Sequence, residues 1–522
     1  MTANKEIKLR DFHALRWEEP VIMEKGVPGQ RGVLVPQAEK EIAEMVGDGL
    51  GQLAGLRRKN PPAIPEISQP QLTRHYMRIT AENLGSDNAL KISDGTCTNK
   101  YNPKVQEHIA SRHPGLTEVH PLQAPETIQG LLEIIYGMEV FLKEVSGLDK
   151  FSFQPGGGAH AVNANASVIR AYHRSRNDHQ RSEIITTINT HPSNAATPAL
   201  NGFKVITLIP GADGLPNLDE FKAALSPKTA AFFITNPEDT GLFNSKIKEF
   251  TDAAHAAGAL CSYDQANGNA VLGIARAREA GFDLCHFNIH KTFSAPHGCF
   301  GPGCGAQGVR DFLAPFLAVP TVEFDGAKYY LDYNRPMSIG KVRSFIGNVS
   351  AVLKGYMWCR TLGADGLKEA STIAVLNNQY LTKKIMEQVP GVSLYFDQGQ
   401  RRMEQTRFSF EKLKADTGCG IEDVNNRLVD YGIPEIWESH HPWTVPEPFT
   451  PEPCESYSRD DLDYFAAVLK KVAQECYDDP EMVKNAPHKA SKHKSLNAFA
   501  EEFKDIASTW RQYQKKFAAQ KG

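Results

Sequence analysis

The chain has 522 residues, of which 41% are hydrophobic and 23% are charged, and its formal net charge at pH 7 is -3. This length is enough for a large core and two or three subdomains, and the composition is that of an ordinary globular protein. The charge balance excludes a basic surface for nucleic acid, and the chain has no apolar run near the ~20 residues of a membrane helix.

The start of the chain and its cysteines indicate a cytosolic protein. Residues 1–8 contain none of the apolar sequence of a signal peptide. The nine cysteines are an odd number, and no two of them form a C-x-x-C pair. Reduced thiols are the simplest interpretation, with a redox pair as the alternative.

The first 125 residues are predicted to form an arm and a helical segment that pack on the main body or on a partner subunit. Helical patterns cover residues 40–56 and 71–84. The proline-rich stretch 61–65 can equally be a solvated linker. An apolar helical pattern over residues 127–146 then stops at Gly147, which predicts a core helix.

Short β-rich runs alternate with helical patterns in the middle of the chain. This alternation predicts an α/β fold with a mainly parallel sheet and helices on both faces, in a large domain of residues 126–350. Ligands of such sheets bind at the carboxyl ends of the strands, where His191, Asp264 and Lys291 fall. The predicted strands are residues 183–188, 205–208, 230–234, 259–263 and 284–287, and one clear intervening helix is 246–257.

The last third of the chain predicts a smaller α+β domain, residues 351–490. It begins with a long helical pattern, and the proline-rich run 441–453 is predicted to cross a surface as extended chain. Residues 491–522 contain an amphipathic, charged helical pattern that favours a packing helix over a membrane helix. This division of the last third of the chain is based on helical patterns over 352–389, 460–475 and 495–519 and on strand patterns over 392–396 and 407–410.

Lys291 stands between a short apolar run and a glycine- and proline-rich segment that ends at Gly303. Glycines let the backbone approach a ligand closely, and burial lowers the pKa of an amine, so that more of it is the free base that attacks an aldehyde. Asp264 ends the preceding strand. An acid and a lysine at the ends of successive strands indicate a site for pyridoxal 5'-phosphate, in which the acid keeps the pyridine nitrogen protonated.

A glycine loop lies upstream of both residues. Residues 154–160, Gln-Pro-Gly-Gly-Gly-Ala-His, precede a helical pattern that runs from Ala161 to about His173, and a glycine loop before a helix N-terminus can hold a phosphate. The order of glycine loop, acid and lysine is that of the aspartate-aminotransferase-like (fold type I) class of pyridoxal enzymes. Likeness to this class implies a seven-stranded type of sheet beside the smaller C-terminal domain.

Several longer segments carry a closer resemblance: residues 96–103, 120–123, 234–243, 263–270, 287–298, 338–345 and 479–488. They resemble the glycine-cleavage P-protein, glycine dehydrogenase (decarboxylating), and within it subunit 2 of the two-subunit form. The resemblance implies that glycine forms a Schiff base with the cofactor, that carbon dioxide leaves, and that the aminomethyl group passes to the lipoyl group of an H-protein. It also implies a subunit 1 partner and a homodimer or heterotetramer.

The resemblance assigns roles to individual residues. Lys291 would form the Schiff base, Asp264 would pair with the ring nitrogen, His191 would stack on the ring, and Ala266 would lie beneath it. The other cofactor-binding candidates are Gly157, Gly158, Ala159, His160, Thr235 and His290.

Candidates for the substrate carboxylate are Lys100, Thr98 and Arg343, although either cation can instead be an ordinary ion-pair residue. His286 and His290 have the His-x-x-x-His spacing that can bind zinc on a helix, and His297 lies in the same segment. Because their segment is strand-like, positions four apart lie far from one another, and no metal site is predicted.

The family's motifs are altered in places. Its glycine loop continues His-Gly-Glu, whereas this chain has His160-Ala161-Val162, and its glycine run after the lysine is interrupted here by Phe300. These changes motivate an alternative, a free-standing pyridoxal enzyme that catalyses decarboxylation, retro-aldol cleavage or transamination of another amino acid. A non-catalytic partner subunit is a third hypothesis, which the presence of Lys291 and Asp264 disfavours.

Overall fold

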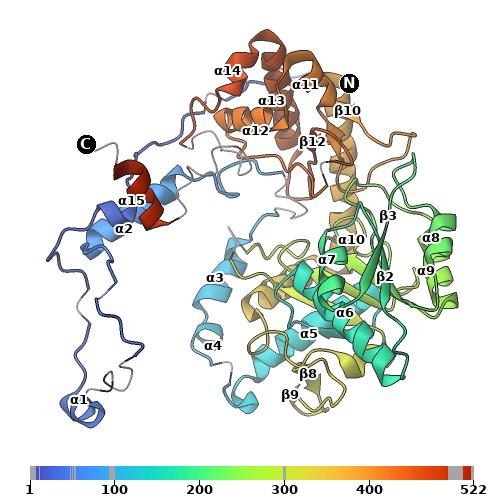
Figure 1. Cartoon of the computed structure of the whole chain (residues 1–522), viewed down its shortest axis with the longest axis horizontal. Coiled ribbons are helices and arrows are strands. Elements are labelled where there is room, and N and C mark those ends of the chain that lie inside the picture. Colours follow the sequence, from blue (N-terminus) through green and yellow to red (C-terminus); the bar gives the residue numbers. More distant parts are fainter. Residues whose placement is uncertain are drawn as a thin grey trace. The chain divides into compact units, whose positions relative to one another are not determined.

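The largest sheet that the structure describes has seven strands, and the structure is a computed structural model of the chain (Figure 1). Strands β2 to β6 run parallel, and β7 is antiparallel to both of its neighbours. The predicted, mainly parallel sheet is thereby confirmed. From edge to edge the order is β1 (Lys150–Ser152), β7 (Gly305–Val309), β6 (Leu284–Asn288), β5 (Leu260–Gln265), β4 (Thr229–Thr235), β2 (Glu183–Thr187) and β3 (Lys204–Leu208).

Some predicted features lie outside the residues that the structure describes. These features are Thr98, Phe300 and most of the predicted helix 495–519, of which α15 (Trp510–Ala518) is described. No helix of the described chain is both long and apolar enough to cross a membrane. The described residues are 7–10, 12–33, 35–47, 49, 51, 55–60, 62–92, 100–120, 122–297, 301–441, 443–491 and 509–518.

The central strands are buried on both faces because successive side chains point to opposite sides of the sheet. In β4, Phe232 and Ile234 belong to one hydrophobic core, whereas Ala231 and Phe233 belong to another. The second core is completed by α6 (Gly158–Ser175). The first is covered by α5 (Gln129–Ser146), α8 (Leu218–Ala224) and α9 (Ile247–Ala256).

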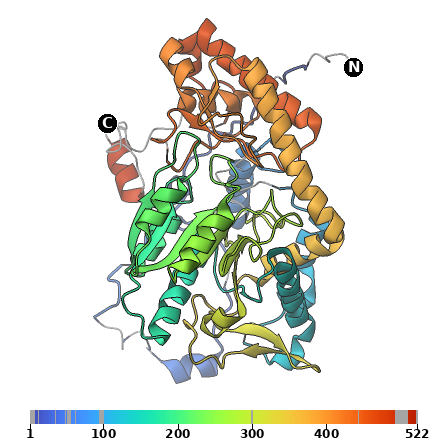
Figure 2. The same cartoon turned by 90° about the vertical axis from the view of Figure 1, so that its right-hand side faces the viewer.

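Helix α10 (Val349–Gln388) belongs to two cores, and Figure 2 shows it running from one to the other. Trp358 lies in the first core of the sheet, and Leu381 and Ile385 lie in the core of the smaller domain. The helix is kinked at Gly363, where φ is 65° and ψ is -174°. The smaller domain contains the antiparallel strands β10 (Ser393–Leu394), β11 (Phe408–Ser409) and β12 (Pro448–Phe449) with α11 (Glu411–Thr417), α12 (Ile421–Leu428), α13 (Arg459–Asp478) and α14 (Pro480–Lys484).

Shorter elements connect these layers. Strands β8 and β9 form a separate antiparallel hairpin, and α7 contacts α6 and β3. The bounds of these connecting elements are α3 (Lys104–Arg112), α4 (Pro114–Thr117), η3 (Pro125–Thr127), α7 (Ser193–Leu200), η4 (Asp311–Phe316), β8 (Thr321–Phe324), β9 (Tyr329–Asp332) and η5 (Val429–Tyr431).

The chain divides into two compact units. The first comprises residues 1–10 and 85–486 and holds both the sheet and the smaller domain, and the second comprises residues 11–84 and 487–522. The division into residues 1–125, 126–350, 351–490 and 491–522 stays a prediction.

Helices of the second unit include one that is shorter than predicted. Its first α-helix covers Lys40–Val46 rather than residues 40–56, because Gly47 has a positive φ of 54° and ends it.

Elsewhere in this unit, Glu19 lies 2.9 Å from His75 Nδ1 and 3.0 Å from Arg78 Nη1. The helices of this unit whose bounds the structure describes are η1 (Ile22–Glu24), α1 (Lys40–Val46), α2 (Gln69–Glu82) and α15.

Candidate active site

A pocket lies at the carboxyl ends of β4 and β5, beside the turn that follows β6. The parallel register places Thr235 opposite Asp264, and Lys291 follows the last residue of β6 by three positions. Asp264 is 4% exposed and Lys291 is 5% exposed. The sheet therefore brings together the acid and the lysine that the sequence singled out. The pocket is lined by His191, Thr235, Pro237, Asp239, Asp264, Ala266, Asn267, Lys291, Glu404 and Gln405.

Asp264 is held by donors on both of its oxygens. Asn194 Nδ2 donates to Oδ2 over 2.7 Å, and the backbone N–H of Ala266 donates to Oδ1 over 3.0 Å. His286 Nε2 lies 3.0 Å from Oδ1 as an ion-pair contact. Burial by itself would raise the pKa of Asp264, but the His286 ring and the hydrogen bonds hold it well below the ordinary value. The carboxylate is thus ionised and oriented, as a partner for a protonated ring nitrogen requires.

His191 and Thr235 border the same space. His191 Nδ1 lies 2.7 Å from Ser193 Oγ and accepts the Ser193 backbone N–H over 3.1 Å. Burial lowers the pKa of His191 to about 4, so the ring is neutral at pH 7 and can stack on an aromatic ligand. Thr235 Oγ1 lies 2.6 Å from the hydroxyl oxygen of Thr190.

The glycine loop ends at the first turn of α6. Gly157 is its N-cap and has no side chain with which to cap the helix, so the first backbone N–H groups, including those of Ala159 and His160, are available to an anion. A Cβ at Gly158 would lie 3.0 Å from Asn288 Nδ2 and 3.6 Å from the Cβ of Ala266. This close packing places the predicted phosphate loop beside the predicted floor of the ring site.

The other side of the loop is equally crowded. A Cβ at Gly303 would lie 2.8 Å from the Gly156 carbonyl, and one at Gly305 would lie 2.9 Å from the Gly157 carbonyl. His160 Nδ1 accepts the Gly156 N–H over 3.1 Å. These glycines therefore have a packing role, since larger residues would displace the loop.

The three histidines around Lys291 have separate partners. His286 faces Asp264, whereas His290 Nδ1 accepts the Cys304 N–H over 3.0 Å, and His297 Nδ1 lies 2.9 Å from the Gly301 carbonyl. Burial, with Lys291 nearby, lowers the pKa of His290 to about 3. The rings of His290 and His297 are in contact edge to face, with 4.5 Å between their centres. His290 is accordingly a neutral neighbour of the lysine and of the glycine loop.

The cations expected to bind the substrate do not line this pocket. Lys100 Nζ forms a 2.8 Å ion pair with Glu455 and lies 4.7 Å from the centre of the Trp358 ring. Arg343 Nη1 donates to the Gly303 carbonyl over 3.2 Å, beside the glycine loop, and lines a separate apolar cavity of about 290 Å³. Thr98 lies outside the described residues.

We call Asp239, Glu404 and Gln405 the acidic wall of the pocket, and His191, Asp264, Ala266 and Lys291 the lysine wall. Each member of the acidic wall has one buried side-chain oxygen without a hydrogen-bond partner among the described residues. Burial, with Glu452 nearby, raises the pKa of Glu404 to about 8. Burial also raises the pKa of Asp239, against the influence of Arg407. The acidic wall is therefore rich in unsatisfied acceptors.

Arg407 lies behind the acidic wall and was not recognised in the sequence. It is 1% exposed, and its two terminal nitrogens have no hydrogen-bond partner within the described chain. Nη2 is 4.0 Å from Asp239 Oδ2, and the guanidinium lies 5.3 Å from the centre of the Trp437 ring. In the sequence, Arg407 is only the first residue of the run 407–410, which predicts a strand.

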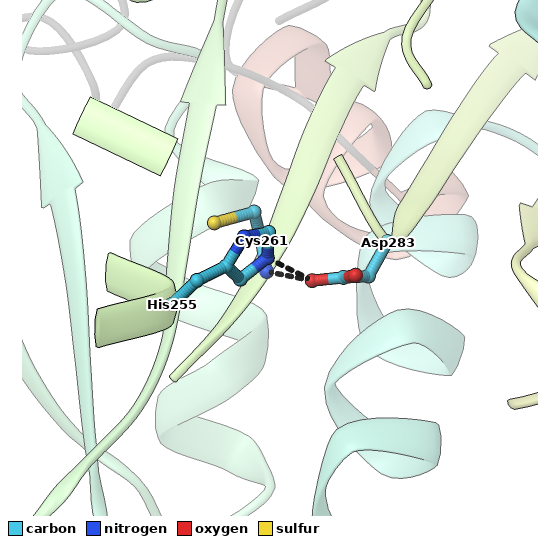
Figure 3. Close-up of side chains that lie close together, drawn as sticks. All are labelled: His255, Cys261 and Asp283. Atoms are coloured by element: carbon cyan, nitrogen blue, oxygen red, sulfur yellow. Dashed lines mark hydrogen bonds and ion pairs between the residues drawn. The ribbon is translucent and has the colours of Figure 1, made fainter. Parts of the chain in front are cut away.

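A group of possible metal ligands lies at the opposite ends of the strands, where His255, Cys261 and Asp283 converge (Figure 3). Asp283 Oδ2 is 2.8 Å from His255 Nε2 and accepts the Cys261 backbone N–H over 2.9 Å. Burial and the nearby carboxylate of Asp283 raise the pKa of the Cys261 thiol well above its ordinary value. Through these contacts the cluster connects α9, β5 and β6.

The chain is similar to known proteins over most of its length. A family model described as "Glycine dehydrogenase, C-terminal domain" matches residues 370–495. A protein of Thermococcus kodakarensis named "Probable glycine dehydrogenase (decarboxylating) subunit 2" is 40% identical over 510 residues, which cover 96% of this chain and 98% of the relative. A protein of the same name from Caldanaerobacter subterraneus is 41% identical over 486 residues, which cover 92% and 95%.

Solved structures share the fold. A crystal structure of glycine decarboxylase (P-protein) of the glycine cleavage system, in inhibitor-bound form, superposes with a TM-score of 0.70 at 21% identity and covers 84% of this chain and 100% of that chain. The cysteine desulfurase CsdA from Escherichia coli superposes with a TM-score of 0.57 at 15% identity over 76% and 98%. These structures confirm the predicted fold class, with its large sheet domain and smaller C-terminal domain.

Proposed function

The chain belongs to the family of glycine dehydrogenase (decarboxylating) subunit 2, and we propose that it is the pyridoxal phosphate-dependent, decarboxylating subunit of a glycine-cleaving enzyme. The observation that carries this proposal is the buried pair of Asp264 and Lys291 at neighbouring strand ends. The relatives support this function over a free-standing pyridoxal enzyme, because each is named as a subunit of glycine dehydrogenase.

The residues of the pocket fit pyridoxal 5'-phosphate. Lys291 would attach its aldehyde carbon, Asp264 would face its ring nitrogen, and the neutral ring of His191 would cover one face, with Ala266 on the other. When bound, the cofactor supplies an electron-accepting ring for the electron pair that is released as the bond from the α-carbon to the carboxylate breaks. The glycine loop fits the phosphate, through Gly157, Gly158, Ala159 and His160, with Thr235 and His290 as further neighbours.

Each of these residues has a chemical task. Lys291 would hold the cofactor, and because its side chain is 5% exposed, its amine would lie in a pocket from which water is largely excluded. The ionised Asp264 would stabilise a positive charge on the ring nitrogen of the bound cofactor, which would strengthen the ring as an electron acceptor. The ring of His191 restricts how the substrate is oriented, since its own position is fixed by Ser193.

The carboxylate of glycine needs a cationic partner. Lys100 is paired with Glu455, and Arg343 lies beside the glycine loop, so each of these predicted residues, like Thr98, keeps its substrate role only as a proposal. Arg407 is a further candidate, because its buried guanidinium presents two nitrogens without partners in the described chain, behind the acidic wall. A carboxylate there would form the bidentate pair that an arginine fork favours.

The partners of this reaction also belong to the proposal. We expect a subunit 1 partner and a lipoylated H-protein that receives the aminomethyl group, in a homodimeric or heterotetrameric assembly. A cytosolic location agrees with the cysteines that the structure describes, all of which are buried thiols.

The experiment that tests this function is an absorbance spectrum of the purified chain with pyridoxal phosphate, recorded with and without glycine. It is followed by measuring exchange of labelled carbon dioxide into glycine, with and without subunit 1 and H-protein. A glycine-dependent spectral change, with exchange that requires the partners, is the expected result. A spectrum that ignores glycine but responds to another amino acid would overturn the assignment of the substrate.

A further inference from the structure

Binding of an amino acid at Lys291 requires the loss of a proton, if the proposed function holds. At neutral pH the incoming amino group is an ammonium ion, and it must be deprotonated before its nitrogen can displace the lysine. The pocket that surrounds Lys291 is buried, so this proton needs a route out. We infer that Asp239 accepts the proton and that His440 carries it from the pocket to solvent.

Asp239 is singled out by comparing the ionisable side chains that line the pocket within the described chain. Lys291 is the group being displaced, and the pKa of Asp264 is held too low for it to keep a proton. Burial raises the pKa of Glu404 to about 8, so at neutral pH it is already protonated. His191 has its Nδ1 engaged by Ser193.

The remaining carboxylate, Asp239, has the properties of a base. It lines the pocket, is 3% exposed, and its Oδ2 has no hydrogen-bond partner among the residues described. Its backbone is fixed, because the Asp239 N–H donates to the Asn189 carbonyl over 2.9 Å and Gln405 Nε2 donates to the Asp239 carbonyl over 2.8 Å. Burial raises its proton affinity above that of an ordinary carboxylate.

His440 connects this carboxylate with the surface. Its Nδ1 lies 3.7 Å from Asp239 Oδ2, slightly beyond hydrogen-bond length, and its side chain is 20% exposed whereas that of Asp239 is 4% exposed. The centre of the His440 ring is also 4.4 Å from the centre of the His191 ring, so His440 contacts the lysine wall. A side chain that contacts both the buried base and solvent is what a proton exit requires.

The proton balance is simple. The substrate ammonium loses one proton to Asp239, which becomes a neutral carboxylic acid. His440 takes that proton at Nδ1 and releases the proton on Nε2 to water, and exchange with water restores the first tautomer. The net result is one proton moved from the amino group to solvent, with no change in oxidation state.

Several charged and titratable groups face His440. They are Asp239 on the loop after β4, Arg407 beside β11, Lys291 after β6, His191 after β2 and the adjacent His441. Burial, with Arg407, His441 and Lys291, lowers the pKa of His440 to about 4. The ring is therefore neutral at pH 7 and has a free electron pair to accept a proton.

The first test measures the protonation of His440 in the cofactor-free protein. The rings of His440 and Trp437 are 4.9 Å apart, so an imidazolium at His440 should quench the fluorescence of that indole. The quenching transition in acid should be present in the unaltered protein, absent in His440→Gln, and shifted to lower pH in Asp239→Asn. Identical titrations in all three proteins would overturn the pairing of Asp239 with His440.

The second test measures the holoenzyme in a stopped-flow mixing experiment with glycine. His440→Gln should slow the absorbance change by about 10- to 100-fold, and added imidazole should restore part of the rate. His179→Gln is the control, because this histidine is exposed and does not line the pocket. Unchanged rates in His440→Gln, or equal slowing in both variants, would overturn the proton exit.

The two proposals fail in different ways. If the unaltered holoenzyme shows no spectral response to glycine, the proposed function fails, while the fluorescence titration still tests the pair of Asp239 and His440. If the unaltered enzyme responds and His440→Gln responds at the same rate, only the proton exit fails. Thermal melting of each variant separates loss of fold from loss of proton transfer.

Discussion

The lysine wall and the acidic wall differ in how their polar atoms are paired. On the lysine wall, both oxygens of Asp264 accept hydrogen bonds from Asn194 and Ala266. On the acidic wall, Asp239, Glu404 and Gln405 each retain an oxygen that no described residue bonds, and Arg407 behind them retains two such nitrogens. One side is organised by the protein's own hydrogen bonds, whereas we expect the other to obtain its partners from a ligand.

The largest effect should come from the centre of the lysine wall. Replacing Lys291 with alanine should reduce carbon dioxide exchange by about 10³-fold or more, because the cofactor loses its covalent attachment. The visible absorbance of the bound cofactor should disappear with it. Lys228→Ala, an exposed lysine of the same domain, is the control and should behave as the unaltered protein. Activity that survives in Lys291→Ala would contradict the role of this lysine.

Asp264→Asn should lower the exchange rate by about 10²-fold, since the ring nitrogen loses its anionic partner. It should also change how stability depends on pH. The pKa of Asp264 lies below its ordinary value of 3.8, so the ionised form stabilises the fold above that pH, and this contribution is lost as pH falls. Urea unfolding of both proteins at pH 3 and pH 6 measures it. A loss of stability that is equal at both pH values would contradict the depressed pKa.

The acidic wall can be tested through its buried cation. Arg407→Lys keeps the charge but loses the bidentate fork, and should raise the KM for glycine by about 30- to 100-fold with a smaller change in kcat. Arg402→Lys is a matched control, because Arg402 is also buried but its Nη2 already donates to the Tyr395 carbonyl over 2.6 Å, whereas both terminal nitrogens of Arg407 have no hydrogen-bond partner among the described residues. It should lower stability and leave the KM unchanged. Equal KM values for both variants would exclude Arg407 as the carboxylate partner.

The smallest effect should be the pH dependence due to Glu404. Its folded pKa of about 8 exceeds the ordinary 4.5, so stability falls as pH rises between these values and the unfolded chain releases its proton first. Glu404→Gln removes this loss and should gain about 3 kcal/mol relative to the unaltered protein between pH 5 and pH 8. Urea unfolding at both pH values checks it, and a difference that does not change with pH would show that Glu404 is ionised in the fold.

The sheet could be predicted from the sequence because most of its strands are buried on both faces and therefore appear as apolar runs. Strand β4 is such a run and was located to within one residue at each end. The edge strand β1 has only three residues, and β7 contains two glycines, so neither produces a comparable pattern. Their place in the sheet depends on pairing with each other, which no local pattern records.

The lysine wall could be predicted because its residues end consecutive strands, whose carboxyl ends converge. The acidic wall could not, because it joins segments that are far apart in the chain. Asp239 follows β4, whereas Glu404 precedes β11 of the smaller domain. Their convergence is fixed by tertiary contacts such as the hydrogen bond from Gln405 Nε2 to the Asp239 carbonyl. Arg407 looked like one polar residue in a strand, and nothing local indicated its burial.

Helix α10 has a consequence for how the first unit melts. Because Ala370 and Ile385 belong to different cores and lie on the same helical segment, the one that follows the Gly363 kink, loss of either core exposes part of the helix that supports the other. The sheet domain and the smaller domain should therefore unfold cooperatively, as a single calorimetric transition. The region matched to the C-terminal family domain begins at residue 370, inside this helix, so a fragment cut there would keep only part of the element that joins the two domains.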